Sequence, residues 1–411
     1  MAPDACSSVQ RRVSASLSDG HQDILHSILS RLSIRQAART SILSNHWKHV
    51  WRCRTNLEFS FRSLVYKKGS GIPRSHISEY VFIQRVNAVL RQHSGVGVEK
   101  LGVEFSPLHH EHAEHIDRWV KFAIASKTKQ LILDFHVQRR GKEPYTFPFQ
   151  LFDATNASHL QSMKLGSMSL KQHASIKFFL NLKKLELEDV NITDEELKVM
   201  LCSCNVLEFI GISRCKVLTC LHTSHPMNRI KHLQVSHCPL LRQIELHFGL
   251  ITFEYEGPLM PLAPPSTLRN ISMKSSDICS ALEYMFTELP STLRCLESLS
   301  LTSEEQKRAT LLNRTLKFLY LRHARLELNF VFLGFGADVL DLACLLQAAP
   351  ILEKLEIHSC QENPIAERTL ALTWNLRVVG VVKVRRRDVE NVNPRHLIDP
   401  YWIAVLAEDE S

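Results

Sequence analysis

Three stretches of this chain repeat one pattern, and that pattern determines the predicted fold. They read LEFIGISRC at residues 207–215, IKHLQVSHC at residues 230–238 and LEKLEIHSC at residues 352–360. Each has apolar residues at its first, fourth and sixth positions and a cysteine at its ninth. Alternate residues of a strand face opposite sides of a sheet, so the fourth and sixth positions share one side. The pattern predicts short parallel strands with one buried face.

The same apolar skeleton recurs on both sides of these stretches. Clear copies occupy Leu182-Leu185-Leu187, Leu296-Leu299-Leu301 and Leu316-Leu319-Leu321, and weaker ones lie at residues 101–103, 131–133, 163–165, 253–255 and 271–273. The last clear copy places Leu319 only 20 residues after Leu299. This is the formula of the leucine-rich repeat, in which each short strand is followed by a helix or loop. We therefore expect residues 98–384 to form an irregular α/β solenoid, with parallel strands lining a concave face and helices and loops on the convex face.

The N-terminal segment has a different, helical pattern. Apolar residues recur at three- and four-residue steps between residues 24 and 32, which predicts a short helix from about Gln22. Further helices are expected at residues 35–42 and 45–52, with Ser33 and Ser44 as N-terminal caps. Residues 1–70 carry eleven Lys or Arg against four acids, while the whole chain has a net charge of +8. A basic helical module therefore precedes a nearly neutral body.

Residues 17–58 resemble the F-box of plant F-box and leucine-rich-repeat proteins. The likeness rests on the run Arg39-Thr40-Ser41-x-Leu43-Ser44-x-x-Trp47 and on Trp51, while Ser18 and Ser33 stand where that family usually has proline. It implies docking on a Skp1-like adaptor and, through it, on the cullin of a ubiquitin ligase. The implied adaptor contacts are Leu17, Leu25, Leu29, Ile34, Leu43 and Trp47. Packing within the module itself is the alternative role for these side chains.

The expected solenoid supplies a second candidate surface. Residues that flank the buried strand positions should face solvent on the concave side. Six of them are candidates for binding a target protein: Glu186, Gln234, Phe318, Tyr320, Arg322 and Glu356. Phe318 and Tyr320 are favoured because aromatics are common hot spots of protein interfaces, although packing against a neighbouring loop is an equal alternative. The mixed polarity of this face argues against a nucleic-acid groove.

The remaining segments have weaker patterns. We expect residues 1–16 to form a disordered tail, residues 59–97 a linker and solenoid cap, and residues 385–411 an atypical tail. Helices are expected at residues 115–126 and 338–349. Residues 116–135 and 345–360 are similar to the repeat region of F-box proteins from grasses, so the likeness covers most of residues 17–382.

Catalytic and metal-binding patterns are weak. No strand leads into a glycine-rich phosphate turn, and the eleven cysteines are odd in number and lack CxxC pairs, which favours free thiols in the cytoplasm or nucleus. No apolar run of about 18 residues indicates a membrane span. In the histidine-rich run at residues 109–115, a zinc-protease motif would need histidine where Glu114 stands, so we expect a solvated, histidine-rich helix start that binds metal at most adventitiously. We therefore expect no cofactor, no metal and no enzymatic activity.

These observations favour one function over two others. The expected role is the substrate-recognition subunit of a Skp1–cullin–F-box ubiquitin ligase, with the target protein on the concave face. The alternative, a nucleic-acid-binding protein, would use the basic N-terminal helices, but the apolar stripe between residues 24 and 32 argues against it. A zinc hydrolase centred on residues 109–115 ranks last.

Overall fold

The computed structural model describes most of the chain up to residue 375. The described residues are 24–25, 27–40, 42–43, 45–64, 79–106, 108–135, 142–171, 179–222, 229–245, 249–258, 262–263, 267–275, 293, 295–303, 317–328, 349–359 and 370–375. They belong to two compact units, the first comprising residues 1–207 and 215–217 and the second residues 208–214 and 218–411. No helix within the described ranges is long and apolar enough to cross a bilayer.

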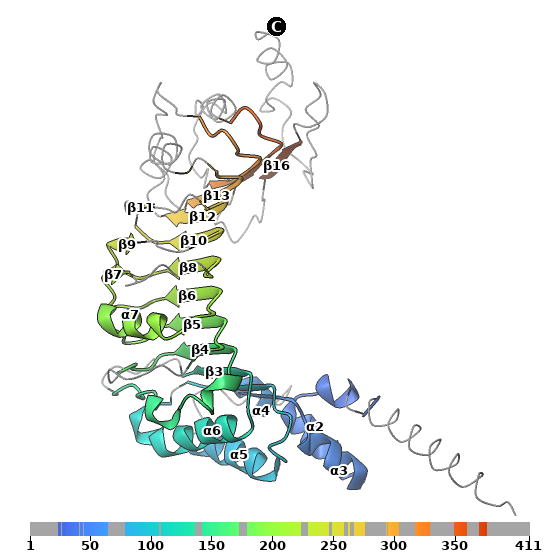
Figure 1. Cartoon of the computed structure of the whole chain (residues 1–411). Helices are drawn as coiled ribbons and strands as arrows, with labels where there is room; N and C mark the ends of the chain where they lie inside the picture. Colours follow the sequence, from blue (N-terminus) through green and yellow to red (C-terminus); the bar gives the residue numbers. More distant parts are fainter. Residues whose placement is uncertain are drawn as a thin grey trace, which may run out of the picture. The chain divides into compact units, whose positions relative to one another are not determined.

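Parallel strands form the core of each unit (Figure 1). The first unit contains, in chain order across the sheet, β1 (Asn56–Ser60), β2 (Lys100–Glu104), β3 (Gln130–Asp134), β4 (Ser162–Gly166) and β5 (Lys184–Glu188). The second contains β6 (Phe209–Ser213), β8 (His232–Ser236), β10 (Thr252–Glu256), β12 (Asn270–Ser275), β13 (Ser298–Ser303), β14 (His323–Leu328), β15 (Lys354–Ser359) and the antiparallel β16 (Leu370–Asn375). A smaller sheet holds β7 (Cys220–Leu221), β9 (Gln243–Glu245) and β11 (Leu262–Ala263). The predicted α/β fold with successive parallel strands is confirmed.

Alternating side chains explain why these segments form strands. From β1 to β14, the short β7, β9 and β11 aside, the second and fourth residues of each strand are buried, as Leu101 and Val103 are in β2. The register places Leu101 between Leu57 of β1 and Leu131 of β3. Each such side chain contributes about 1.5–3 kcal/mol by leaving water. Each repeat is covered only by the neighbouring repeats, so the stack needs a cover at its ends.

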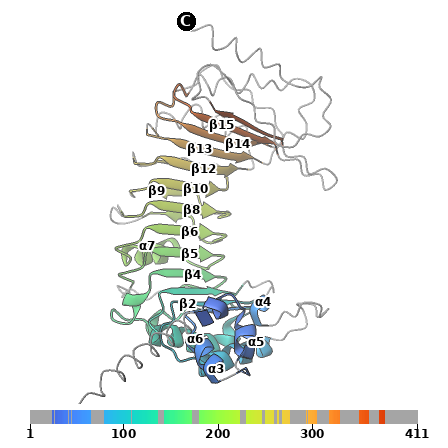
Figure 2. The same cartoon turned by 90° about the vertical axis from the view of Figure 1, so that its right-hand side faces the viewer.

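Most of the helices belong to the first unit. Residues 24–25 and 27–30 are helical, and they are followed by α2 (Ile34–Thr40), α3 (Asn45–Arg52), α4 (Phe61–Leu64), α5 (Glu79–Gln92), α6 (Ala113–Ala125) and α7 (Asp194–Cys202). Short 3-10 segments lie at η2 (His110–His112), η3 (Phe149–Leu151) and η4 (Ala157–His159). Figure 2 shows α3 to α6 gathered at the end of the sheet where β2 lies.

Several predicted elements can be compared with these helices. Helices expected at residues 45–52 and 115–126 are present as α3 and α6. The sequence does not predict α5, which lies in the segment expected to form a linker and solenoid cap. The expected helix at residues 338–349, apart from its last residue, and the expected tails at residues 1–16 and 385–411 lie outside the described residues.

The strand near residue 320 differs from the predicted one. β14 is His323–Leu328, so the described residues of the expected repeat, 317–321, precede the strand. Leu299 of β13 pairs with Ala324, and Leu319 is 56% exposed. The interval between these two repeats is therefore longer than predicted. Ala324 occupies the first inward position of β14, where the repeat formula expects a large apolar residue. The formula therefore does not identify this strand.

β1 joins the helical module to the repeats. The module boundary expected at residue 58 falls inside β1, which is already the first strand of the sheet. Helices α2 and α4 contact this strand. The carbonyl oxygen of Thr55 accepts hydrogen bonds from the N–H groups of Glu99 and Lys100, at 2.8 and 3.1 Å. The helical module and the first repeat therefore share backbone hydrogen bonds.

His93, just after α5, closes the same junction. Its Nε2 lies 2.9 Å from the carbonyl oxygen of Arg54, and its Nδ1 accepts the N–H of Gly95 at 3.0 Å. Because Nδ1 is an acceptor, we assign the ring proton to Nε2, and both bonds then belong to the neutral imidazole. Burial lowers the pKa of His93, although the hydrogen bond to the Arg54 carbonyl opposes this. The junction therefore requires a neutral histidine.

Protonating His93 should weaken the protein. Folding lowers the pKa of His93, so the unfolded chain binds the proton more readily. The stability that the neutral ring contributes is therefore complete above about pH 6.5 and is lost as the pH falls through the pKa of His93 in the folded protein. His93→Gln keeps a donor and an acceptor without titrating. Its loss of unfolding free energy between about pH 7.5 and 5.5 should therefore be smaller than that of the wild type.

Chemical denaturation at each pH measures this difference. His93→Ala should lose about 2 kcal/mol even at neutral pH, because two backbone groups lose their partners. Identical pH dependence in the wild type and His93→Gln would contradict the assigned role.

Candidate partner-binding surfaces

The helical module has a small core that is completed by a residue from outside the module. The buried cluster consists of Leu29, Ala37, Val50 and Trp51, with Leu25, Leu32, Ala38, Trp47 and Val89 packed around it. Val89 belongs to α5, well beyond the module in the sequence. Nη2 of Arg54 also donates to the carbonyl oxygen of Ser30 at 3.2 Å. A helical unit of this size has too little core to be stable alone, so α5 completes it.

These packing roles correct part of the predicted adaptor site. Leu29 and Ile34 are only 2% and 3% exposed, so their side chains stabilise the module and offer no contact surface. Leu25 and Trp47 are half-buried against the same core. The physical reason is that the apolar stripe must first cover its own helices, because the module has few other apolar residues to bury.

Four aliphatic side chains of the module do face solvent. Ile24 and Ile28 lie on the first helical segment, and Ile42 and Leu43 form the turn between α2 and α3. Their exposed fractions are 59%, 44%, 86% and 65% in that order. Single exposed aliphatic residues are ordinary, but four in so short a module favour a surface that meets a partner. Of the predicted adaptor contacts, Leu43 is therefore available, and Leu17 lies outside the described residues.

The sheet of the first unit carries ion pairs on its solvent-facing side. We call this side, formed by the first, third and fifth residues of β1 to β5, the front face. Lys100 Nζ lies 2.6 Å from Glu58 Oε1, across β1 and β2. Lys164 bridges Asp134 and Glu188, at 3.2 and 3.0 Å. Burial alone would lower the pKa of Lys164, but these two carboxylates outweigh it and raise that pKa.

Gly166 makes room for the Lys164 bridge. A Cβ placed on Gly166 would lie 2.3 Å from Oδ1 of Asp134, whose side chain is almost completely buried. Any larger residue at 166 would have to displace that carboxylate. Gly102 on β2 is different, because the nearest atom to a Cβ placed there is 3.8 Å away. A neighbour therefore requires glycine at position 166, and no neighbour requires it at position 102.

Three of the predicted target-binding residues do lie on strands. Glu186 is on the front face of β5, with its Oε1 3.1 Å from Lys184 Nζ. In the second unit, Gln234 is exposed on β8. Glu356 lies on β15, where it is paired with Arg325 and Lys354.

The other three predicted target-binding residues precede β14 and do not join Gln234 and Glu356 on the strand face. Phe318 is 2% exposed, so the expected exposed aromatic is a core residue. Tyr320 is 53% exposed in the loop before the strand. Arg322 forms an ion pair with Glu353 at 2.5 Å. This correction follows from the shifted register of β14.

The strands of the second unit also carry charges of both signs. His232 Nε2 lies 3.0 Å from Glu254 Oε1, and Lys274 Nζ lies 2.8 Å from Glu256 Oε1. A groove for nucleic acid would instead be lined by cations. The mixed polarity that the sequence predicted for this face is confirmed for these residues.

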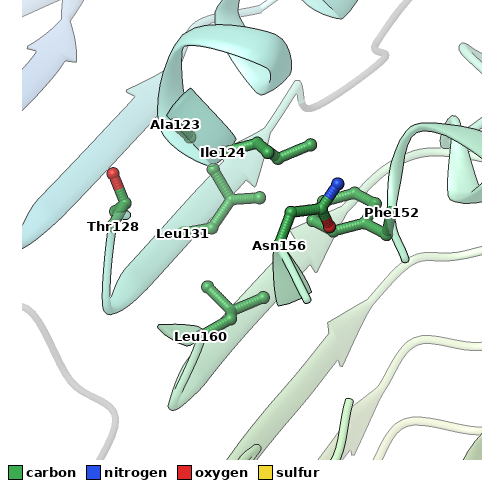
Figure 3. A pocket seen from close by; sticks show the side chains of 7 residues that line it. All are labelled: Ala123, Ile124, Thr128, Leu131, Phe152, Asn156 and Leu160. Atoms are coloured by element: carbon green, nitrogen blue, oxygen red, sulfur yellow. The ribbon is translucent and has the colours of Figure 1, made fainter. Parts of the chain in front are cut away.

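A small cavity lies between α6, β3 and the segment before β4 (Figure 3). Its volume is about 10 Å³, and it is lined by Ala123, Ile124, Thr128, Leu131, Phe152, Asn156 and Leu160. The lining contains no carboxylate, amine, imidazole or thiol. A space of this size holds about one water molecule, so it is no substrate site.

One residue of the histidine-rich run, His109, is buried in the first unit. His109 is 5% exposed, and its N–H donates to Nδ1 of His112 at 3.3 Å. Burial lowers the pKa of His112, and the nearby His109 adds to this effect. The run leads into the start of α6, as expected, and His110, Glu111 and Glu114 are exposed, but the expected exposure to solvent is wrong for His109. Among the residues that the structure describes, no group of three His, Cys, Asp or Glu is arranged to hold a metal ion.

Known proteins share this combination of parts. Residues 21–58 match the family model of the F-box domain, and residues 89–388 match the model described as "At1g61320/AtMIF1, LRR domain". The chain is 27% identical to the Arabidopsis thaliana "F-box/FBD/LRR-repeat protein At1g13570" over 198 residues, which are 48% of the chain and 44% of that protein. It is 25% identical to the Arabidopsis thaliana "F-box/LRR-repeat protein 25" over 234 residues, or 57% and 80% of the two chains. The chain spans about half the length of the first of these relatives and of several other curated relatives that it matches.

The helical module and the stacked strands define an F-box protein with a leucine-rich-repeat domain. Because the repeat model matches most of its length, the chain belongs to the F-box/LRR-repeat family. The family predicted from the Arg39–Trp47 run and the repeat formula is confirmed.

Gly166→Ala should destabilise the first unit. The added methyl group would overlap the Asp134 carboxylate and move it away from Lys164, which we expect to cost about 1–3 kcal/mol of unfolding free energy. Gly102→Ala is the matched control, because it meets ordinary contacts and replaces a strand glycine; it should be neutral or stabilising by up to about 1 kcal/mol. Urea unfolding of both variants measures the difference, and equal stabilities would be inconsistent with the role of Gly166.

Proposed function

We propose that this protein is the substrate-recognition subunit of a Skp1–cullin–F-box ubiquitin ligase. The observation that carries the proposal is the exposure of Ile24, Ile28, Ile42 and Leu43 on a module of the F-box family. A Skp1-like adaptor that covered these side chains would gain about 25 cal/mol for each Å² of apolar surface removed from water. The exposed cations Arg31 and Arg39 of the same module favour an acidic adaptor.

The repeats would supply the target-binding half of this function. Their strands present paired charges of both signs, which suit the polar surface of another protein. By holding a target near the ubiquitin carrier of the ligase, the subunit raises the effective concentration of the target's lysines. The subunit therefore positions its partners and performs no bond chemistry, needs no cofactor, and works in the cytoplasm or nucleus.

The junction between module and repeats supports this positioning role. Thr55 and His93 tie the end of the module to the first repeat through hydrogen bonds. The four exposed aliphatic side chains of the module and the front face therefore belong to one unit. A fixed separation between adaptor and target limits the positions that a target lysine can sample.

The double variant Ile42→Asp, Leu43→Asp should lose adaptor binding while remaining folded. Both side chains are exposed, so the charges disturb no core, but they would be desolvated against the adaptor. Size-exclusion chromatography of each chain with a recombinant Skp1-type adaptor, with the melting temperature measured in parallel, tests this prediction. We expect the wild type to co-elute with the adaptor and the double variant to elute alone.

Val96→Asp provides the matched control. Val96 is 74% exposed in the loop before β2, outside the module, so this variant should still bind the adaptor. If the wild type fails to bind any Skp1-type adaptor, or if the double variant binds as well as the control, the proposed function is refuted.

A further inference from the structure

The register of β1 to β5 arranges the front face in rows that cross the strands. The central row contains Glu58, Gly102, Ile132, Lys164 and Glu186. A second row, at the carboxyl ends of the strands, contains Ser60, Glu104, Asp134, Gly166 and Glu188. Ile132 is the one apolar side chain in these two rows, and it is half-buried. This mostly polar face therefore has one aliphatic residue, Ile132, directly beside Gly102.

Gly102 has no structural reason to be glycine. Its backbone does not adopt a left-handed conformation, and a Cβ there would meet Glu58 and Ile132 at 3.8 Å, an ordinary contact distance. Glycine inside a strand costs stability and commonly marks a place where a ligand or another chain approaches closely. The contrast with Gly166, whose Cβ position is blocked by Asp134, draws attention to the surface beside Gly102, where Gly102 is buried, Ile132 is half-buried and Glu104 is exposed.

The charges beside this spot favour a basic partner. Glu104 and Asp134 are register partners on adjacent strands, and like charges opposite each other are destabilising. Asp134 is compensated by Lys164, whereas Glu104 is exposed and forms no ion pair with any residue in the described ranges. A cation supplied by a partner would relieve this repulsion.

We propose that the front face over β1 to β4 binds an extended, basic segment of the target protein. An aliphatic side chain of that segment packs against Ile132, beside the buried Gly102, and an adjacent Lys or Arg pairs with Glu104. The inference rests on the proposed function, since it names the chemistry of the target that the subunit would receive. Four strands about 4.8 Å apart span about 14 Å, so four or five extended residues would cross this face.

Selection from a phage-displayed library of random heptapeptides on the immobilised full-length chain tests this inference. We expect enrichment of peptides that place Lys or Arg next to Leu, Ile or Val. An enriched pool that is neutral or acidic would overturn the inference, as would the absence of any enriched peptide. The selected peptides then serve as fluorescent probes for measuring affinity by polarisation.

Two variants and a control locate the binding. Glu104→Lys reverses the charge, and Gly102→Val adds to the front face, beside Ile132, a β-branched side chain that strands accept. Each variant should bind the selected peptide with an affinity lower by about tenfold or more, which is the effect of losing one well-placed contact. Glu143→Lys makes the same charge change at an exposed loop position away from the strands and should leave the affinity unchanged. Equal affinity of all four chains would refute the location.

Adaptor binding, followed by size-exclusion chromatography on the same preparations, separates this inference from the proposed function. Peptide selection without adaptor binding would contradict the ligase role and leave the basic-segment surface standing. Adaptor binding without selection of basic peptides would contradict the surface alone.

Discussion

The structure depends on two inward-facing apolar side chains in each strand from β1 to β14, the short β7, β9 and β11 aside. Because each repeat is covered only by its neighbouring repeats, the first strand needs another partner on its outer side. In the first unit, the helical module contacts β1, and Leu57 and Phe59 are each only 1% exposed. The module in turn needs Val89 of α5 to complete its own core. The module therefore covers the end of the repeats, and a helix beyond the module completes the module's core.

This mutual dependence gives the proposed function its geometry. A receptor that joined its adaptor module to its target surface by a loose linker would spread the target over a large volume. In this chain, backbone hydrogen bonds at Thr55 and the neutral ring of His93 hold the two together. The exposed aliphatic residues of the module and the front face then belong to one ordered unit, so what binds one surface is placed with respect to the other.

The sequence predicted the elements with strong periodicity and missed those defined by neighbours distant in the chain. The strand positions from β2 to β13, except those of the short β7, β9 and β11, follow from the spacing of large apolar residues, whereas β14 was misplaced because Ala324 takes an inward position usually held by leucine. The helical stripe identified the module, but spacing could not show that Leu29 is buried and Ile28 exposed, because the approach of α5 decides this. The Gly166–Asp134 contact needs the register between strands, which a single sequence does not contain.

The central claim is that one chain holds an adaptor and a target at the same time. Its most direct test is mass spectrometry of ubiquitin remnants on proteins that co-purify with the tagged full-length chain from proteasome-inhibited plant cells, comparing the wild type with the Ile42→Asp, Leu43→Asp variant. The account predicts that the same proteins co-purify with both chains and that their ubiquitin remnants fall sharply with the variant. Unchanged remnants on those proteins, or no proteins shared by the two purifications, would contradict it.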